Sequence, residues 1–194
     1  MPDTRDVVVI VGSLRKASWT RRIATALIRL APPSLKLEIV EIGDLQLYNQ
    51  DFDDEHRVPA EWQRFRDRVS RADAVIFATP EYNRSVSGVL KNAIDVGSRP
   101  YGKSAWSRKP AAVVSVSPGA IGAFGANHHL RQSLVFLDMP TLQQPEIYLG
   151  GVASLVDAEG NIVKEETRKF LVAFLTAFAG WTEIFAPSAA STLR

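Results

Sequence analysis

The chain has 194 residues, of which 46% are hydrophobic and 23% charged, and its formal net charge is only +2. This composition indicates one ordinary globular domain, and so small a charge argues against a nucleic-acid-binding surface. The sequence contains no cysteine, which excludes disulfides and thiol redox chemistry, so any electron transfer needs a borrowed cofactor. Because no apolar stretch has the length of a membrane span and the first residues do not resemble a signal peptide, we expect a cytoplasmic protein without membrane partners.

The first half of the chain alternates strand and helix patterns. Residues 7–11 are a β-branched run, typical of a strand buried on both faces of a parallel sheet. Ser18 can cap the helix that follows, and residues 35–42 form a second predicted strand. Residues 43–59 are a long polar connection, and Pro59 begins a helix. The apolar residues of that helix are spaced for one buried face: Trp62, Phe65 and Val69.

No metal site is expected. The polar connection contains the acidic residues Asp51, Asp53, Asp54 and Glu55. They lack the glycine and the spaced final carboxylate of a calcium loop, so we expect a solvated loop. The neighbouring residues His128 and His129 fall on a predicted helix and would point to different faces, so they could not chelate one ion together.

The second half continues the alternation. Strands are predicted at 72–80, at 109–117 and within 139–150, where Pro145 cannot donate to a sheet ladder and therefore marks an edge strand. The helix faces between and after these strands are expected to bury Val86, Val89, Leu90, Ala93 and Ile94, then Leu130, Leu134 and Leu137, and finally Val163, Phe170, Phe174, Phe178 and Trp181. We expect a single domain over residues 1–185 and a flexible tail at 186–194.

Five strands alternating with helices predict an α/β fold with a doubly wound parallel sheet and helices on both faces. Right-handed crossovers and the edge position of the last strand favour the order 2-1-3-4-5. Ligands of such sheets bind beyond the carboxyl ends of the strands, at the switch point between strands 1 and 3. This topology would bring together three segments: residues 12–22, 79–88 and 117–125.

The first of these segments favours a phosphate monoester. The next glycine after Gly12 is Gly43, so the glycines that a dinucleotide pyrophosphate or a P-loop requires are absent. The segment instead offers a helix N-terminus, the hydroxyls of Ser13, Ser18 and Thr20, and the guanidiniums of Arg15, Arg21 and Arg22. These groups suit the phosphate of a mononucleotide. The alternative is that Ser18 only caps the helix and the arginines form a solvated face.

The stretches "GSLRKASWTRR", "ATPEYNRSVSGVLKNAID", "SPGAIGAFG" and "LRQSL" resemble the NAD(P)H-dependent FMN reductase family, in its quinone and chromate reductase branch. The resemblance covers roughly residues 5 to 180. It implies a flavodoxin-like fold, FMN as cofactor, NADPH or NADH as co-substrate, and a small acceptor such as a quinone. It also implies a homodimer or homotetramer, for which the small residues Gly88 and Gly97 would allow close packing of a helix from another subunit.

The resemblance also assigns the site residues. Ser13, Arg15, Ser18, Thr20 and Arg21 would form the phosphate cradle. Pro80, Glu81, Tyr82 and Asn83 would line the pyrimidine side of the flavin, with Tyr82 near the ring. Backbone amides from Ser117 through Gly122, including Gly119, would stabilise charge on the reduced flavin.

In the implied mechanism, hydride moves directly between nicotinamide C4 and flavin N5 in ping-pong half-reactions, so no side chain acts as acid or base. Glu81 and Asp95 are expected to make local hydrogen bonds instead. Acceptors could include quinones, chromate, azo compounds or free flavin. Two other roles stay open: a flavin reductase supplying reduced FMN to a monooxygenase, and a non-enzymatic FMN electron carrier. The net charge of +2 counts against the carrier, since such proteins are typically strongly acidic.

Overall fold

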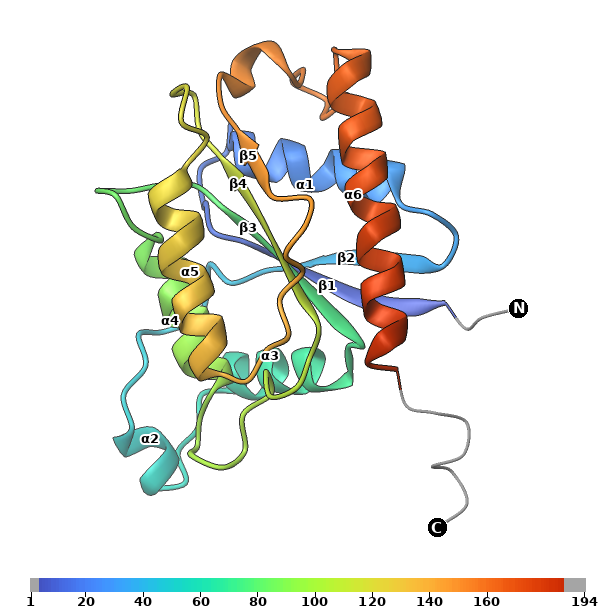
Figure 1. Cartoon of the computed structure of the whole chain (residues 1–194). Coiled ribbons are helices and arrows are strands. Elements are labelled where there is room, and N and C mark those ends of the chain that lie inside the picture. The colour runs from blue at the N-terminus through green and yellow to red at the C-terminus, as the bar shows by residue number, and fades with distance from the viewer. Residues whose placement is uncertain (1–3, 187–194) are drawn as a thin grey trace.

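A five-stranded parallel sheet forms the centre of the protein (Figure 1), for which a computed structural model describes residues 4–186. The strands are β1 (Arg5–Val11), β2 (Leu35–Val40), β3 (Ala74–Thr79), β4 (Ala111–Val116) and β5 (Ile147–Leu149). Their order is β2-β1-β3-β4-β5, and every neighbouring pair is parallel. This confirms the predicted order and places the switch point between β1 and β3.

Helices cover both faces of the sheet (Figure 1). On one face lie α1 (Trp19–Leu30) and α6 (Glu165–Ile184); on the other lie α3 (Ala60–Arg71), α4 (Gly88–Gly97) and α5 (Phe124–Phe136). Short helical turns occur at α2 (Asp51–Asp54) and η1 (Val152–Ser154). Alternate residues of β1 enter opposite cores, with Val7 and Val9 facing α1 and α6 while Val8 and Ile10 face α3 to α5. The continuous β-branched run of the sequence is therefore buried on both sides.

Two serine hydroxyls fix the helices that begin at the carboxyl edge of the sheet. Ser18 Oγ accepts a hydrogen bond from the Arg21 amide at 3.1 Å, which confirms it as the cap of α1. Ser87 Oγ accepts from the Leu90 amide at 3.4 Å and caps α4 in the same way. Both hydroxyls stand where a loop leaves the sheet, so they set the direction in which each helix departs.

Gly97 is an internal packing position. A Cβ atom added there would lie 2.6 Å from the ring of Trp106, whose Nε1 donates to the Ile94 carbonyl oxygen at 2.9 Å. The expectation that Gly97 serves the packing of another subunit is therefore wrong, because the indole of Trp106 already occupies the space above it.

The last helix differs from its predicted pattern. It begins at Glu165, so Val163 precedes it and is 66% exposed, while Phe170 is 38% exposed. Phe174 and Phe178 are buried as predicted, and the buried face is completed by Leu171, Leu175 and Thr182. Residues 187–194 of the expected tail lie outside the described residues, and the single domain over 1–185 stays a prediction. Among the described residues, none of the helices has the length and apolar content that crossing a bilayer requires.

The acidic stretch is not wholly a solvated loop. Asp53 lies on α2 with its side chain 4% exposed, and its two carboxylate oxygens accept from Arg66 at 2.7 and 2.8 Å. Arg66 Nε also donates to the Val96 carbonyl oxygen at 2.9 Å. The hydrogen bonds from Arg66 hold the pKa of Asp53 below its usual range. A buried ion pair thus ties the polar connection to α3.

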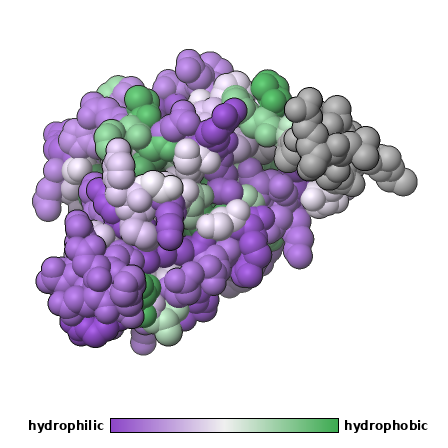
Figure 2. Space-filling view, turned by 90° about the horizontal axis from the view of Figure 1, so that it is seen from below, coloured by the Kyte–Doolittle hydropathy of each residue, from purple (hydrophilic) through white to green (hydrophobic). Residues whose placement is uncertain are grey.

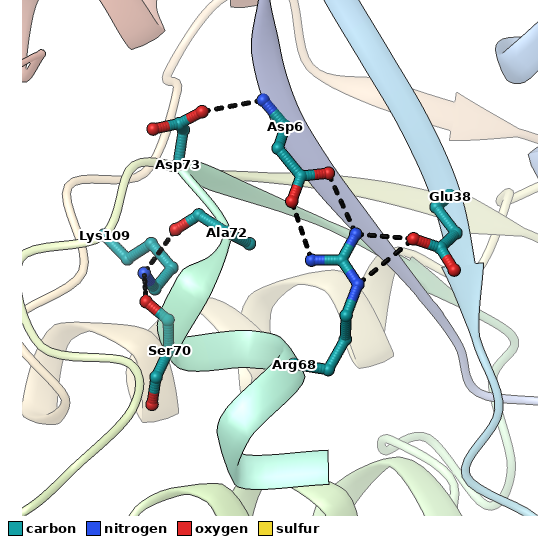
Figure 3. A network of polar contacts seen from close by, with 7 residues as sticks. All are labelled: Asp6, Glu38, Arg68, Ser70, Ala72, Asp73 and Lys109. Atoms are coloured by element: carbon teal, nitrogen blue, oxygen red, sulfur yellow. Dashed lines mark hydrogen bonds and ion pairs between the residues drawn. The ribbon is translucent and has the colours of Figure 1, made fainter. Parts of the chain in front are cut away.

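A second polar network lies at the amino ends of the strands (Figure 3). Arg68 donates to Asp6 on β1, with both nitrogen–oxygen distances 2.9 Å, and to Glu38 on β2. Lys109 Nζ donates to two carbonyl oxygens at the end of α3, at 2.5 and 3.3 Å, and burial lowers the pKa of this lysine. The network fastens α3 to β1, β2 and the segment before β4.

Figure 2 views the molecule from below and shows a mostly hydrophilic surface broken by small apolar patches.

Replacing Arg66 with Met should lower the free energy of unfolding by about 3 to 5 kcal/mol, because it leaves the Asp53 carboxylate buried without its partner. The control is Arg64→Met in the same helix, whose pair with Asp44 is 60% and 54% exposed; its cost should be about 0 to 1 kcal/mol. Urea unfolding measures both variants. Equal losses of unfolding free energy in the two variants would show that burial does not make the Asp53–Arg66 pair more important than an exposed pair.

The Asp53–Arg66 pair also makes the free energy of unfolding depend on pH in the acid range. Because the pKa of Asp53 is lowered in the folded state, the pair contributes stability above the unfolded value of about 3.9 and loses it as pH falls through the folded value. Between pH 5 and 2, the free energy of unfolding of Asp53→Asn should therefore fall less steeply than that of the wild type. Urea unfolding at several pH values across this window tests it, and identical slopes would contradict it.

Candidate functional site

The loops after β1 and β3 are joined at the carboxyl edge of the sheet. The Ser87 hydroxyl donates to the carbonyl oxygen of Gly12 at 2.6 Å, and the Gly12 amide donates to the Ala78 carbonyl oxygen at 2.8 Å. A Cβ atom at Gly12 would lie 3.0 Å from Pro80 Cδ and 3.1 Å from Ser87 Oγ. The absence of a side chain at residue 12 favours this close approach, because a Cβ atom there would require its neighbours to shift by a few tenths of an ångström.

The first loop carries a set of hydrogen-bond donors that face no protein partner. Ser13, Ser18 and Thr20 are 4%, 2% and 2% exposed, yet the hydroxyls of Ser13 and Thr20 make no hydrogen bond within residues 4–186. The backbone amides of residues 13–17 also have no acceptor in the described part of the chain. These donors lie just before α1 and in its first turn, and α1 is a helix of 12 residues, so its N-terminus adds favourable potential for an anion. The set suits a single phosphate group.

Arg21 is not a free cation of this cradle. Its two terminal nitrogens donate to the carboxylate of Glu41 at 2.8 and 2.6 Å, and these hydrogen bonds raise the pKa of Arg21. Arg22 lies over the ring of Trp19, with 4.4 Å from its Cζ to the ring centroid. Arg15 is exposed on the loop itself. Of these three arginines, Arg15 is the one with a guanidinium that no described residue engages, whereas the guanidinium of Arg21 is already paired with Glu41.

The segment after β3 forms a tight hairpin. Tyr82 and Ser85 exchange backbone hydrogen bonds at 3.0 Å each, and Asn83 and Arg84 have φ angles of 52° and 65°. Two successive residues with positive φ are typical of a type I′ turn, in which Asn is favoured. Tyr82 is 47% exposed beside this turn, so its ring is available to a ligand.

Glu81 holds the third segment in place. Its carboxylate oxygen Oε2 accepts from the Ala126 amide in the first turn of α5 at 3.0 Å. A Cβ atom at Gly125 would lie 2.8 Å from the Arg84 carbonyl oxygen, so the helix start packs tightly on the hairpin. Asp95 likewise pairs with Lys91 at 2.8 Å. The prediction that these two carboxylates make hydrogen bonds within the protein is confirmed, and Oε2 of Glu81 is already engaged by the Ala126 amide.

The amides of the third segment are largely occupied. The amide of Ser117 donates to the Leu149 carbonyl oxygen at 2.9 Å, that of Gly119 to Ser117 Oγ at 3.0 Å, and that of Gly122 to the Gly119 carbonyl oxygen at 3.4 Å. Three of the amides in the row from Ser117 through Gly122, which the resemblance assigns to the reduced flavin, are therefore already engaged within the protein. Among the described residues, only the amides at positions 120 and 121 of this row lack an acceptor.

Gly122 serves the fold more than a ligand. Its φ is 64°, and a Cβ atom there would lie 2.7 Å from the backbone of Tyr148 on β5. The glycine thus lets the third segment cross close to the edge strand. Nothing in the sequence signals this contact, because β5 lies more than twenty residues further along the chain.

Together, these features define a flavodoxin-like mononucleotide-binding protein: an open parallel sheet, one phosphate-sized cradle at the end of β1, and a tyrosine-bearing hairpin after β3. Within residues 4–186, no three His, Asp or Glu side chains gather as a metal site would require.

The family model of NADPH-dependent FMN reductase matches residues 5–154, and the chain belongs to this family. It is 64% identical over 184 residues to a quinone reductase of Pseudomonas putida, covering 95% of this chain and 98% of that protein. It is 45% identical over 175 residues to a 2-hydroxy-1,4-benzoquinone reductase of a Burkholderia species, covering 90% and 94%.

Among solved structures, the chain is similar to FerB of Paracoccus denitrificans, a flavoenzyme NAD(P)H:(acceptor) oxidoreductase. The TM-score is 0.88 at 41% identity, over 94% of this chain and 99% of that one. The protein is thus an oxidoreductase with FMN as its cofactor. The donor set on the loop after β1 fits that cofactor, since FMN carries a single terminal phosphate.

Replacing Arg15 with Ala should weaken FMN binding by about 1.5 to 3 kcal/mol, the range for a hydrogen bond to a charged group. Arg21→Ala is the matched control, because its guanidinium is already paired with Glu41 and should change FMN affinity little. Fluorescence titration of the flavin-free proteins measures both. If Arg21→Ala costs as much as Arg15→Ala, Arg21 belongs to the cradle after all.

Proposed function

We propose that the protein is an NAD(P)H:quinone oxidoreductase that retains FMN as a prosthetic group. The observation that carries this proposal is the set of unpartnered donors at the end of β1, which are the hydroxyls of the buried residues Ser13 and Thr20 and the amides of residues 13–17, next to the exposed Tyr82. The cradle supplies a reason for tight FMN retention, and the similarity to a quinone reductase and to a 2-hydroxy-1,4-benzoquinone reductase favours a quinone as acceptor.

The residues of the chain bind and position, and they need not transfer protons. Ser13, Thr20 and Arg15 would hold the phosphate, while residues 80–83 and the free amides at 120 and 121 would face the ring. When bound, FMN supplies a group that accepts a hydride from NAD(P)H and passes it to the acceptor. The Glu81 carboxylate is engaged by the Ala126 amide, so it serves to hold the site in shape.

Apolar side chains around the site suit planar substrates. Leu14, Tyr82, Ile121 and Phe124 are 50%, 47%, 64% and 48% exposed, and each belongs to one of the three loops at the carboxyl edge. Such side chains can pack against a nicotinamide or quinone ring and exclude water from it. Chromate, azo compounds and free flavin as acceptors, a cytoplasmic location and a homo-oligomer stay predictions beside this proposal.

If both planar substrates use the same side of the site, NAD(P)⁺ must leave before the quinone enters. Double-reciprocal plots at several quinone concentrations should therefore be parallel. Anaerobic addition of NADPH or NADH alone should bleach the visible absorbance of the loaded protein. The FMN that must be added for full activity should be substoichiometric to the NAD(P)H that is oxidised. Intersecting plots, or absorbance that persists under excess of both nucleotides, would contradict the proposal and favour an electron carrier.

A rate that depends on excess free FMN would be a separate outcome. Rates that saturate only when free FMN exceeds the protein concentration would show that FMN is a substrate. That result would favour a flavin reductase that supplies a monooxygenase.

A further inference from the structure

A second cavity adjoins the site on the side of β2. It has a volume of about 340 Å³ and lies between residues 42–47 and the first turn of α4. Its walls are mostly apolar, with Ile42, Leu45 and Val89 inside and Leu47 and Tyr82 at the rim. In Figure 1 the chain that leaves β2 runs beside α4, which is where this cavity forms.

The polar side chains of the cavity are already satisfied. Asn92 on α4 donates through Nδ2 to the carbonyl oxygens of Leu45 and Gln46 at 3.2 and 3.0 Å, and its Oδ1 accepts from the Tyr48 amide at 2.9 Å. Ser87 Oγ donates to the Gly12 carbonyl oxygen. The cavity is therefore rigid on its α4 side. Apart from Tyr82, it offers an occupant little but apolar surface, which favours an apolar ligand.

The cavity shares residues with the flavin segment. Tyr82 belongs both to its rim and to the hairpin after β3, and Ser87 is bonded to the glycine at which the cradle begins. A planar substrate placed against residues 80–83 could therefore extend an apolar part past Tyr82 into the cavity. Leu47, which is 80% exposed, stands at the rim where such a group would enter.

We propose that this cavity binds the apolar substituent of the electron acceptor, such as the second fused ring or a short alkyl group of a quinone. The inference rests on the proposed function and gives it a substrate class: fused-ring or alkylated quinones above unsubstituted benzoquinone. The volume lies at the lower end of the usual range for ligand pockets of about 300 to 1,000 Å³, as expected for part of a ligand.

Gly88 offers a direct way to fill the cavity. It is the first residue of α4 and lines the cavity, and a Cβ atom there would meet nothing within 4 Å. Gly88→Leu should therefore occupy the cavity without a backbone clash, and leucine is a better helix former than glycine. Gly180→Leu on α6 is the matched control, because it too meets nothing within 4 Å and lies far along the chain on the other face.

The test compares 2-methyl-1,4-naphthoquinone with 1,4-benzoquinone on the FMN-loaded proteins. In Gly88→Leu the ratio of their kcat/KM values should fall by about tenfold or more, the effect of one or more methylene groups in an apolar pocket. Calorimetric titration of the oxidised, loaded protein with 2-methyl-1,4-naphthoquinone should show a similar loss of affinity. Gly180→Leu should keep both values of the wild type.

Three other outcomes would overturn the inference, each in a distinct way. An unchanged ratio and unchanged affinity, with quinone reduction intact, would leave the proposed function standing and refute the cavity. Loss of FMN affinity in Gly88→Leu would assign the cavity to the cofactor, and an altered sedimentation coefficient would assign it to a subunit contact. If the wild type reduced neither quinone, the proposed function would fail, and the calorimetric titration would still decide on the cavity.

Discussion

The hydrogen bond from the Ser87 hydroxyl to the Gly12 carbonyl oxygen is the contact on which the site depends. It fastens the loop after β1 to the start of α4 across the switch point of the sheet. The absence of a Cβ atom at residue 12 favours the 2.6 Å bond and the close approach of Pro80. The cradle, the hairpin with Tyr82 and the apolar cavity all border this one contact, so its geometry sets their relative positions.

Most charged groups near the site hold the loops and do not face a ligand. Arg21 is paired with Glu41, and the Glu81 carboxylate binds the start of α5. What remains for a ligand, among the described residues, is a set of hydroxyls and amides together with the exposed Arg15 and Lys16 on the loop after β1. This division suits a protein whose chemistry resides in a bound cofactor, because such a protein must bind and orient rather than transfer protons.

Much of the architecture could be predicted from the sequence, because it follows from local patterns. The β-branched run at Val7 to Val11 signals a doubly buried strand, Ser18 caps α1, and Pro145 precedes the edge strand β5. The last helix was misjudged because Val163 continues the helical spacing of the apolar residues. The sheet, not that spacing, decides which face of α6 is buried.

The part of the site that could not be predicted from the sequence has a shared cause, which is pairing between residues far apart in the chain. Arg21 reaches a carboxylate on the segment after β2, and Glu81 reaches an amide 45 residues later. Asp53 is buried because α2 folds onto Arg66 of α3. A single sequence shows which charges exist, but not which of them the fold brings together.

The central claim is that the loop after β1 holds one phosphate, and titration of the flavin-free protein with FMN and with FAD tests it most directly. The loop has no glycine beyond Gly12 that would let a backbone approach a pyrophosphate. The account predicts saturation at one FMN per chain and much weaker binding of FAD. Equal affinity for FAD, or no saturable binding of FMN, would contradict it.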